Sequence, residues 1–322
     1  MDFNSSEPVS PSAIRVLITG FGPFSRYAEN PSWLAVKPLH NTILYTQPES
    51  NPVPYNDQMS TDEDVDMPAA PQQIHITAIE IPVTYKAVRS CVPGLHSRPP
   101  VLPQPNDPEF IIPPPPLNGY DFILHVSVAG RGHIRLEKVS HKLGYRMKDA
   151  EGQYAPTVQV PKEGPVMDEA DRFEQQRLLL MSFDGSSDES GLQHPGAERG
   201  EGHGGSEVEQ PSRGFGQGYE NYPDELYTEI DVARLIHHLK ESGTEQVYSS
   251  MDAGHFLCDY AFYCSLAESK RVAGKQEKDK GTPPKSTPIL AMHCGPVDQP
   301  LSTEEVTETI RKIVMWVCAR LG

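Results

Sequence analysis

Three side chains of the kinds used in nucleophilic catalysis stand far apart in this sequence. They are a thiol, an imidazole and a carboxylate, at Cys258, His293 and Glu137, and each follows a segment with the pattern of a β-strand. A nucleophile, a base that activates it and a third group that orients the base form one catalytic arrangement. The sequence therefore raises the hypothesis of a cysteine nucleophile acting on a carbonyl.

Cys258 has the strongest local context of the three. It follows Gly254, which permits a sharp turn, and a helical pattern begins at about Phe256, so that Cys258 falls in the first helical turn. The unpaired N–H groups and the positive dipole end of a helix favour the thiolate form of a cysteine there. The structural alternative for Cys258 is a small buried hydrophobe, for His293 a satisfied polar residue at a strand end, and for Glu137 a solvated charge beside Lys138.

The other cysteines are weaker candidates for a nucleophile. Cys264 lies six residues beyond Cys258, about 240° around a helix, so the two cannot share one face. Cys294 directly follows the histidine, and in an extended segment its side chain points to the opposite side. Cys91 and Cys318 fall within helical patterns and are most simply packing residues.

Charge and hydropathy exclude several classes of protein. The 322 residues include 28 basic and 44 acidic side chains, for a net charge of −16. Nucleic acids and anionic membranes require basic surfaces, so we expect neither as a partner. No apolar run approaches the roughly 18 residues of a membrane span, and the start lacks signal-peptide features, so we expect a cytoplasmic protein. The thinly spread cysteines and histidines lack the spacing of metal ligands, and we expect no metal or cofactor.

Several stretches have compositions that favour disorder. Residues 97–116 include nine prolines, and residues 184–218 include ten glycines. Such composition cannot bury enough apolar surface to offset the entropy of ordering. We therefore expect one α/β domain over residues 14–322, with flexible segments at 1–12, 47–70, 97–118, 156–221 and 272–286.

The remaining blocks alternate between strand and helix patterns. Helical patterns begin at Pro31, cover 232–239 and follow a capping box at Ser302, and short β-branched runs predict strands at 14–19, 74–81, 122–126, 246–249 and 288–292. This alternation predicts a three-layer α/β/α sandwich with a mainly parallel central sheet. In that architecture functional residues lie in loops at the carboxyl ends of the strands.

Five motifs, one in each block, resemble the pyroglutamyl-peptidase I family of cysteine peptidases. Thr19-Gly20-Phe21-Gly22-Pro23-Phe24 followed by Asn30-Pro31-Ser32 resembles the family signature T-G-F-x-P-F-x(n)-N-P-S. Ile81-Pro82-Val83 with Tyr85 matches the motif of the second strand. Leu136-Glu137-Lys138 stands at the place of the family's glutamate, Ala253 to Asp259 resembles A-G-x-[FY]-[VL]-C-[ND], and His293-Cys294-Gly295-Pro296 stands at the place of H-V-P.

The resemblance implies a function and a set of roles. Peptides with an N-terminal pyroglutamate would be the substrates, and the amide bond after that residue would be cleaved through a thioester. Cys258 would be the nucleophile, His293 the general base and acid, and Glu137 the residue that orients the imidazole. Phe21, Phe24, Phe256 and Leu257 would surround the lactam ring, and a monomer is favoured.

Two other functions stay open at this point. One is an inactive family member that binds a partner through its acidic insertions, although a binding protein has no need of the three catalytic groups. The other is an amidohydrolase with the same chemistry on a different N-blocked residue.

Overall fold

The computed structural model describes residues 8–46, 70–130, 132–159, 211–278 and 286–321. Contacts divide the chain into a unit formed by Met1–Thr157 with Arg213–Gly322 and a unit formed by Val158–Ser212. Almost all of the second unit, together with the expected flexible residues 1–7, 47–69 and 279–285, lies outside the described ranges. The helices and strands of the described ranges all belong to the first unit.

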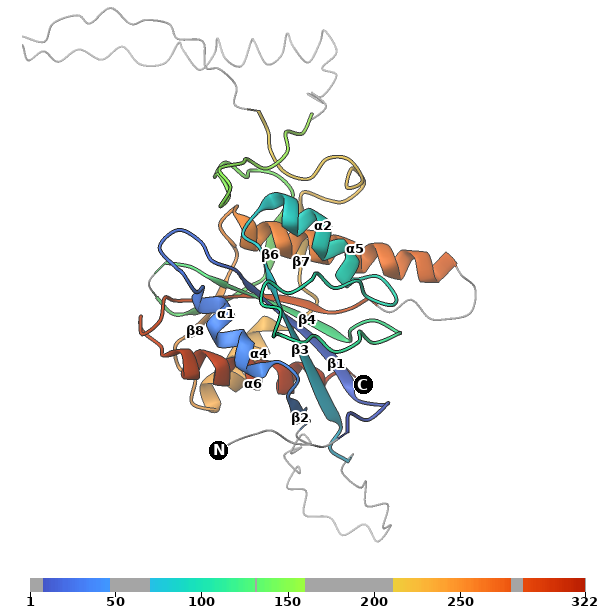
Figure 1. Ribbon diagram of the computed structural model, residues 1–322, viewed down its shortest axis with the longest axis vertical. Helices are drawn as coiled ribbons and strands as arrows, with labels where there is room; N and C mark the ends of the chain where they lie inside the picture. Colours follow the sequence, from blue (N-terminus) through green and yellow to red (C-terminus); the bar gives the residue numbers. More distant parts are fainter. Residues whose placement is uncertain (1–7, 47–69, 131, 160–210, 279–285, 322) are drawn as a thin grey trace, which may run out of the picture. The chain divides into compact units, whose positions relative to one another are not determined.

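The centre of this unit is a mixed seven-stranded sheet (Figure 1). Its strand order is β2-β3-β1-β4-β9-β5-β8. The parallel part consists of β1 (Ile14–Phe21), β3 (Gln73–Ile81), β4 (Phe122–Val128) and β9 (Ile289–Cys294). At the edges, β2 (Ile43–Tyr45) is antiparallel to β3, while β5 (Ile134–Glu137) and β8 (Val247–Ser250) are parallel to each other, and β5 is antiparallel to β9. The predicted, mainly parallel sheet is confirmed.

Helices cover both faces of the sheet, which confirms the three-layer sandwich (Figure 1). One face carries α2 (Tyr85–Leu95) and α5 (Leu257–Lys278), and the other carries α1 (Pro31–Val36), α4 (Val232–Glu241) and α6 (Thr303–Cys318). A short 3₁₀ helix, Lys37–Leu39, follows α1, and a small hairpin pairs β6 (Val139–His141) with β7 (Glu225–Tyr227). None of the helices in the described ranges has the length and apolar character of a bilayer span.

Alternation along the strands divides the core into two clusters. In β9, Leu290, Met292 and Cys294 belong to the cluster under α4 and α6, whereas Ile289 and Ala291 belong to the cluster under α5. Successive side chains of a strand point to opposite faces. His293 therefore lies on the α5 face, and Cys294 is buried on the other face, as its position after the histidine predicted.

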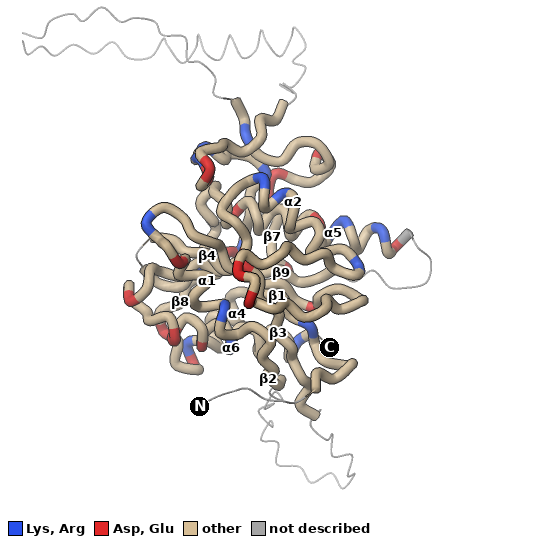
Figure 2. Tube along the Cα trace, viewed as in Figure 1, with Lys and Arg blue, Asp and Glu red and all other residues tan. Residues whose placement is uncertain are grey.

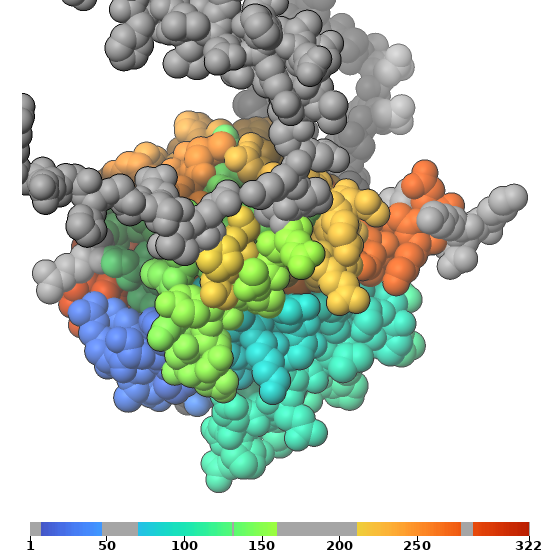
Figure 3. Space-filling model, turned by 90° about the horizontal axis from the view of Figure 1, so that it is seen from above, coloured from blue at the N-terminus to red at the C-terminus, as the bar shows by residue number. Residues whose placement is uncertain are grey.

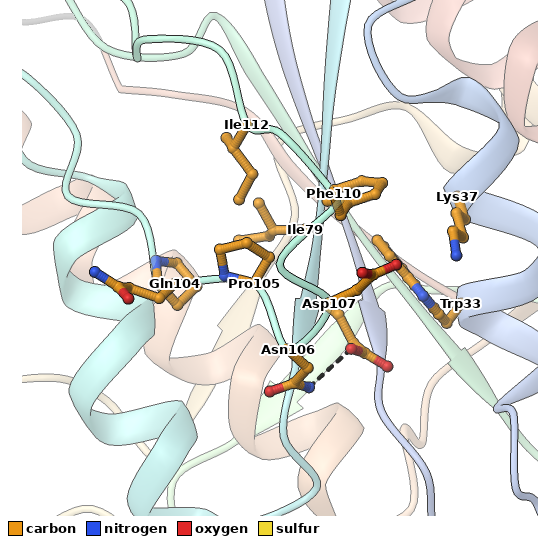
Figure 4. Close-up of a pocket in the computed structure, with 11 residues that line it drawn as sticks. Trp33, Lys37, Ile79, Gln104, Pro105, Asn106, Asp107, Phe110 and Ile112 are labelled. Atoms are coloured by element: carbon orange, nitrogen blue, oxygen red, sulfur yellow. Dashed lines mark hydrogen bonds between the residues drawn. The ribbon is translucent and has the colours of Figure 1, made fainter.

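Residues 97–118 differ from the expectation of disorder. They form an irregular segment that is described throughout and packs against the sheet and α1. The Phe110 ring lies 5.3 Å from that of Trp33 and 4.2 Å from that of His40, and Figure 4 shows it beside a small cavity with Trp33 and Ile79. The proline-rich composition did not indicate that a few apolar residues anchor this segment. Proline also lowers the conformational entropy that the segment loses when it becomes ordered.

The described ends of the predicted flexible segment 156–221 also belong to the fold. Phe215 is buried, and its ring stacks on Tyr260 of α5 at 4.1 Å between centroids. Just before this segment, residues 148–155 lie against α2 (Figure 3). The Asp149 carboxylate accepts a hydrogen bond there from the Tyr85 amide. Residues 272–278, also expected to be flexible, continue α5.

Phe215 provides a test of this packing. Replacing Phe215 with alanine is expected to lower the free energy of unfolding by about 3 to 5 kcal/mol, because it removes a buried aromatic ring and leaves a cavity beside Tyr260. Denaturant-induced unfolding measures the difference. An unchanged midpoint would show that residues 211–221 do not contribute to the core.

Candidate active site

Buried charges single out two places in this fold. Acidic and basic residues are spread over the described chain (Figure 2), but few acidic side chains are buried. Asp149 and Glu268 are held by backbone amides and by a tyrosine hydroxyl. The other two, Glu137 and Asp259, are fully buried and each contacts a histidine. Because burial of a carboxylate is costly unless it is paired, these two histidine contacts indicate candidate functional sites.

Glu137 and His293 meet because β5 and β9 are antiparallel. Glu137 pairs with Ala291, and Arg135 pairs with His293, so Glu137 and His293 are diagonal neighbours on one face of the sheet. Their distance is 2.7 Å from Nδ1 of His293 to Oε1 of Glu137. The carboxylate therefore accepts the Nδ1 proton, which leaves Nε2 as the ring atom that can engage a thiol.

Cys258 reaches the same face from the start of α5. The helix begins at Leu257, so Cys258 is its second residue, in the first turn as predicted. Gly254 and His255, with φ of 90° and 45°, turn the chain into the helix through left-handed conformations. The Cys258 side chain interacts electrostatically with the His293 ring. The first N–H groups of α5 have no acceptor within the helix and remain available to a ligand.

The route by which the three groups meet differs from the sequence-based expectation. We expected each to follow a strand at one rim of a parallel sheet. Instead, β5 and β8 run opposite to β9, and Glu137 lies at the level of Ala291, away from that rim. The thiol, imidazole and carboxylate converge over one face of the sheet, under the start of α5. The β5 strand, which carries Glu137, was not predicted from its short pattern.

The partners of His293 decide its charge. The ring is 4% exposed, and this burial alone would lower its pKa. The neighbouring Cys258 and Glu137 outweigh burial and raise the pKa of His293 to about 9. Arg135 lies 3.6 Å from the same Glu137 oxygen and is about half exposed. The imidazolium is therefore the favoured form of His293 at neutral pH.

This charge can be measured directly. We expect the His293 ring in the wild-type protein to lose its proton near pH 9, detected by NMR of labelled imidazole. In Cys258→Ala the pKa of His293 should fall by about 1 to 3 pH units, because the neighbour that contributes most to raising it is removed. A ring that titrates near pH 6.5 in both proteins would contradict the interaction.

A pocket of about 340 Å³ opens beside Cys258. The rings of Phe24 and Phe256 lie 5.7 Å apart within its wall. All four aromatic and aliphatic residues expected around a ring-shaped ligand line it, whereas His293 and Glu137 are not among its lining residues. The full lining consists of Phe21, Phe24, Ser25, Arg26, Tyr27, Asn30, Val83, Ser127, Val128, Ala129, Phe256, Leu257 and Cys258.

Hydrogen bonds with Asn30 and Ser32 hold the turn at Gly20 to Phe24 in position. Asn30 donates from Nδ2 to the Gly22 carbonyl at 3.0 Å and accepts from the Ser32 amide, while Ser32 Oγ accepts from the Phe21 amide. A Cβ at Gly20 would come within 2.9 Å of the Trp33 backbone, so only glycine fits there. Asn30 also caps the start of α1, and its place in the pocket wall was not expected from the sequence.

Comparisons with known proteins identify relatives of this chain. No family model matches the chain. Human pyroglutamyl-peptidase 1 is 21% identical over 301 residues, covering 93% of this chain and 87% of that protein. Rat pyroglutamyl-peptidase 1 is 27% identical over 135 residues, and this match spans 42% of the chain and 43% of the rat protein.

Solved structures share the fold. A mutant pyrrolidone carboxyl peptidase from Pyrococcus furiosus matches with a TM-score of 0.53 and 16% identity, covering 96% of this chain and 100% of that chain. Pyroglutamyl peptidase I from Bacillus amyloliquefaciens matches with a TM-score of 0.52 and 18% identity, covering 95% and 97%. On the order of its motifs, its fold and these relatives, the chain is a member of the pyroglutamyl-peptidase I family.

Proposed function

We propose that this chain is a cysteine peptidase that hydrolyses the amide bond after an N-terminal pyroglutamyl residue. The observation that carries the proposal is the series from Cys258 through His293 to Glu137, with its thiol end at an aromatic pocket. In this series Cys258 interacts electrostatically with the His293 ring, and the ring is hydrogen-bonded to Glu137. A nucleophile, a base and an orienting acid in that order are the components of covalent acyl transfer. The pocket supplies the place for the acyl group.

The charges of the series support a defined sequence of steps. In the reactive form, Cys258 is a thiolate beside the imidazolium of His293, and Glu137 stabilises that imidazolium through Nδ1. The thiolate attacks the carbonyl carbon, and N–H groups in the first turn of α5 stabilise the oxyanion that forms. The C–N bond then breaks as the leaving amine takes the proton from His293. Water, with its proton accepted by His293, hydrolyses the thioester and restores the thiolate and the imidazolium.

The pocket is suited to a lactam. Among the described residues that line it, Arg26 is the only one with a charged side chain, and the walls near Cys258 are aromatic. A pyroglutamyl ring has no free amine, so its recognition needs a flat apolar slot with hydrogen-bonding groups for the ring N–H and C=O. Proline lacks the ring carbonyl and would leave such groups unpaired. The expected preference for pyroglutamyl over prolyl amides reaches about 10⁴ in kcat/KM.

The assay that tests the function uses wild-type protein and a set of fluorogenic amides. We expect release of the amine from the pyroglutamyl amide, with prolyl, alanyl and acetyl amides turned over at least 10⁴-fold more slowly. Alkylation of thiols should abolish the release. Preferred turnover of the acetyl or prolyl amide would favour an amidohydrolase with another specificity. Absence of turnover with every amide would favour a non-catalytic binding protein.

A further inference from the structure

A cluster of two histidines and one aspartate, separate from the candidate active site, lies near the start of α5. It consists of His141 at the end of β6, Asp252 in the loop after β8, and His255 in the turn that leads into α5. One ligand atom from each residue lies within 4.8 Å of the other two, and no other such group occurs among the residues that the structure describes. Neither the proposed catalytic steps nor the pocket uses any of these side chains.

The hydrogen bonds of the two rings leave one nitrogen of each available. Nδ1 of His141 lies 2.9 Å from Oδ2 of the buried Asp259, and Nδ1 of His255 lies 3.1 Å from the Leu143 carbonyl oxygen. Both rings therefore have their Nδ1 held by acceptors, and their centroids are 4.2 Å apart. Within the described ranges, Nε2 of neither ring has a hydrogen-bond partner. Histidines that bind metals typically donate their other N–H to a carboxylate or a carbonyl in this way.

The backbone holds these groups in place. His255 has a φ of 45°, an uncommon conformation for a residue other than glycine, and its ring packs against Gly144, where an added Cβ would come within 2.9 Å of Nδ1. Asp252 accepts a hydrogen bond from the Gly254 amide at 2.7 Å through Oδ1. The same turn thus carries two of the three groups.

We propose that His141, Asp252 and His255 form a binding site for a divalent transition-metal ion, with Zn²⁺ as the ion best matched to the ligands. Two imidazole nitrogens and one carboxylate oxygen at about 2.0 to 2.2 Å are a common three-ligand set for zinc, with water in the fourth position. Tetrahedral ligands lie about 3.3 Å apart, and the three ligand atoms lie within 4.8 Å of one another, so the groups must close by at most about 1.5 Å. The exposed Asp252 can supply this movement by side-chain rotation.

The bound ion would link β6 to the turn that precedes Cys258, without occupying the Cys258–His293 pair. A ligand that binds only the folded protein stabilises it in proportion to the logarithm of its concentration over Kd. Zn²⁺ is therefore expected to raise the melting temperature. The proposal concerns binding and does not depend on peptidase activity.

The test uses the full chain with Cys258→Ser, so that the thiol beside His293 cannot ligate the metal. Isothermal titration with ZnCl2 is expected to show one site, and thermal unfolding is expected to shift upward with Zn²⁺. His255→Gln and Asp252→Asn, each made in this background, should raise the Kd for Zn²⁺ by at least about 10- to 100-fold. A loss of that size is typical even when only a residue that hydrogen-bonds a metal ligand is changed. Both residues lie at the surface or partly exposed, so the variants should fold.

A matched control separates this site from an ordinary surface pair. His237 and Glu241 on α4 form an exposed pair 3.2 Å apart, which also offers an imidazole and a carboxylate. His237→Gln should leave Zn²⁺ affinity unchanged. Binding that is equal in the parent, His255→Gln and Asp252→Asn proteins would overturn the proposal, as would no binding at 100-fold excess Zn²⁺ over a 10 µM protein sample.

Discussion

Replacing Cys258 with alanine is expected to reduce kcat/KM for a pyroglutamyl amide by at least about 10⁴-fold, because no other group can form the covalent bond to the acyl carbon. Removal of the nucleophile from a catalytic triad typically eliminates almost all of its rate enhancement. Affinity for the substrate should change much less, since the pocket wall is made mainly of other residues. Single-turnover kinetics with the fluorogenic amide measures the loss, and substrate binding to the variant is measured separately.

Cys91 provides the matched control. It is also partly exposed, but it lies on α2 and is a neighbour of Ser90, not of His293. Cys91→Ala should retain activity within about 2-fold, as expected for a surface change away from the site. Full activity in Cys258→Ala would contradict the covalent mechanism.

Replacing Glu137 with glutamine should have the second largest effect, a loss of about 10² to 10⁴-fold in kcat/KM. The amide is similar in shape but has no charge, so it stabilises the imidazolium of His293 less and can favour the wrong tautomer. The pKa of His293 should fall for the same reason. The pH profile distinguishes this role from a structural one, because the alkaline limb of activity should move from about pH 9 toward neutral pH.

Glu80→Gln is a suitable control for this variant. Glu80 is half-buried on β3 and accepts a hydrogen bond from Asn106 at 2.8 Å, but it lies on another strand, away from His293. We expect its pH profile to match that of the wild type. An unchanged profile in Glu137→Gln, with similar thermal stability, would remove Glu137 from the proposed series.

Local signals in the sequence were sufficient for the regular elements. The apolar runs of β1, β3, β4 and β9 and the capping box of α6 depend on neighbours a few residues away, and they appear where the patterns predict. Short strands such as β5 carry too few residues for a pattern, since their pairing with β8 and β9 comes from distant parts of the chain. The proline-rich segment was misjudged because composition does not record where Phe110 packs.

The same distinction applies to the candidate site. The residue types and motifs around Cys258, His293 and Glu137 could be identified from the sequence alone, since they depend only on the order of side chains. The contact between Glu137 and His293 could not be predicted, because it results from the antiparallel pairing of β5 with β9, which makes the two residues diagonal neighbours. The cluster of His141, Asp252 and His255 depends even more on the fold, because His141 lies more than a hundred positions before the other two residues in the sequence. Side-chain chemistry is a local property of the chain, whereas the distances that let it act are fixed by long-range packing.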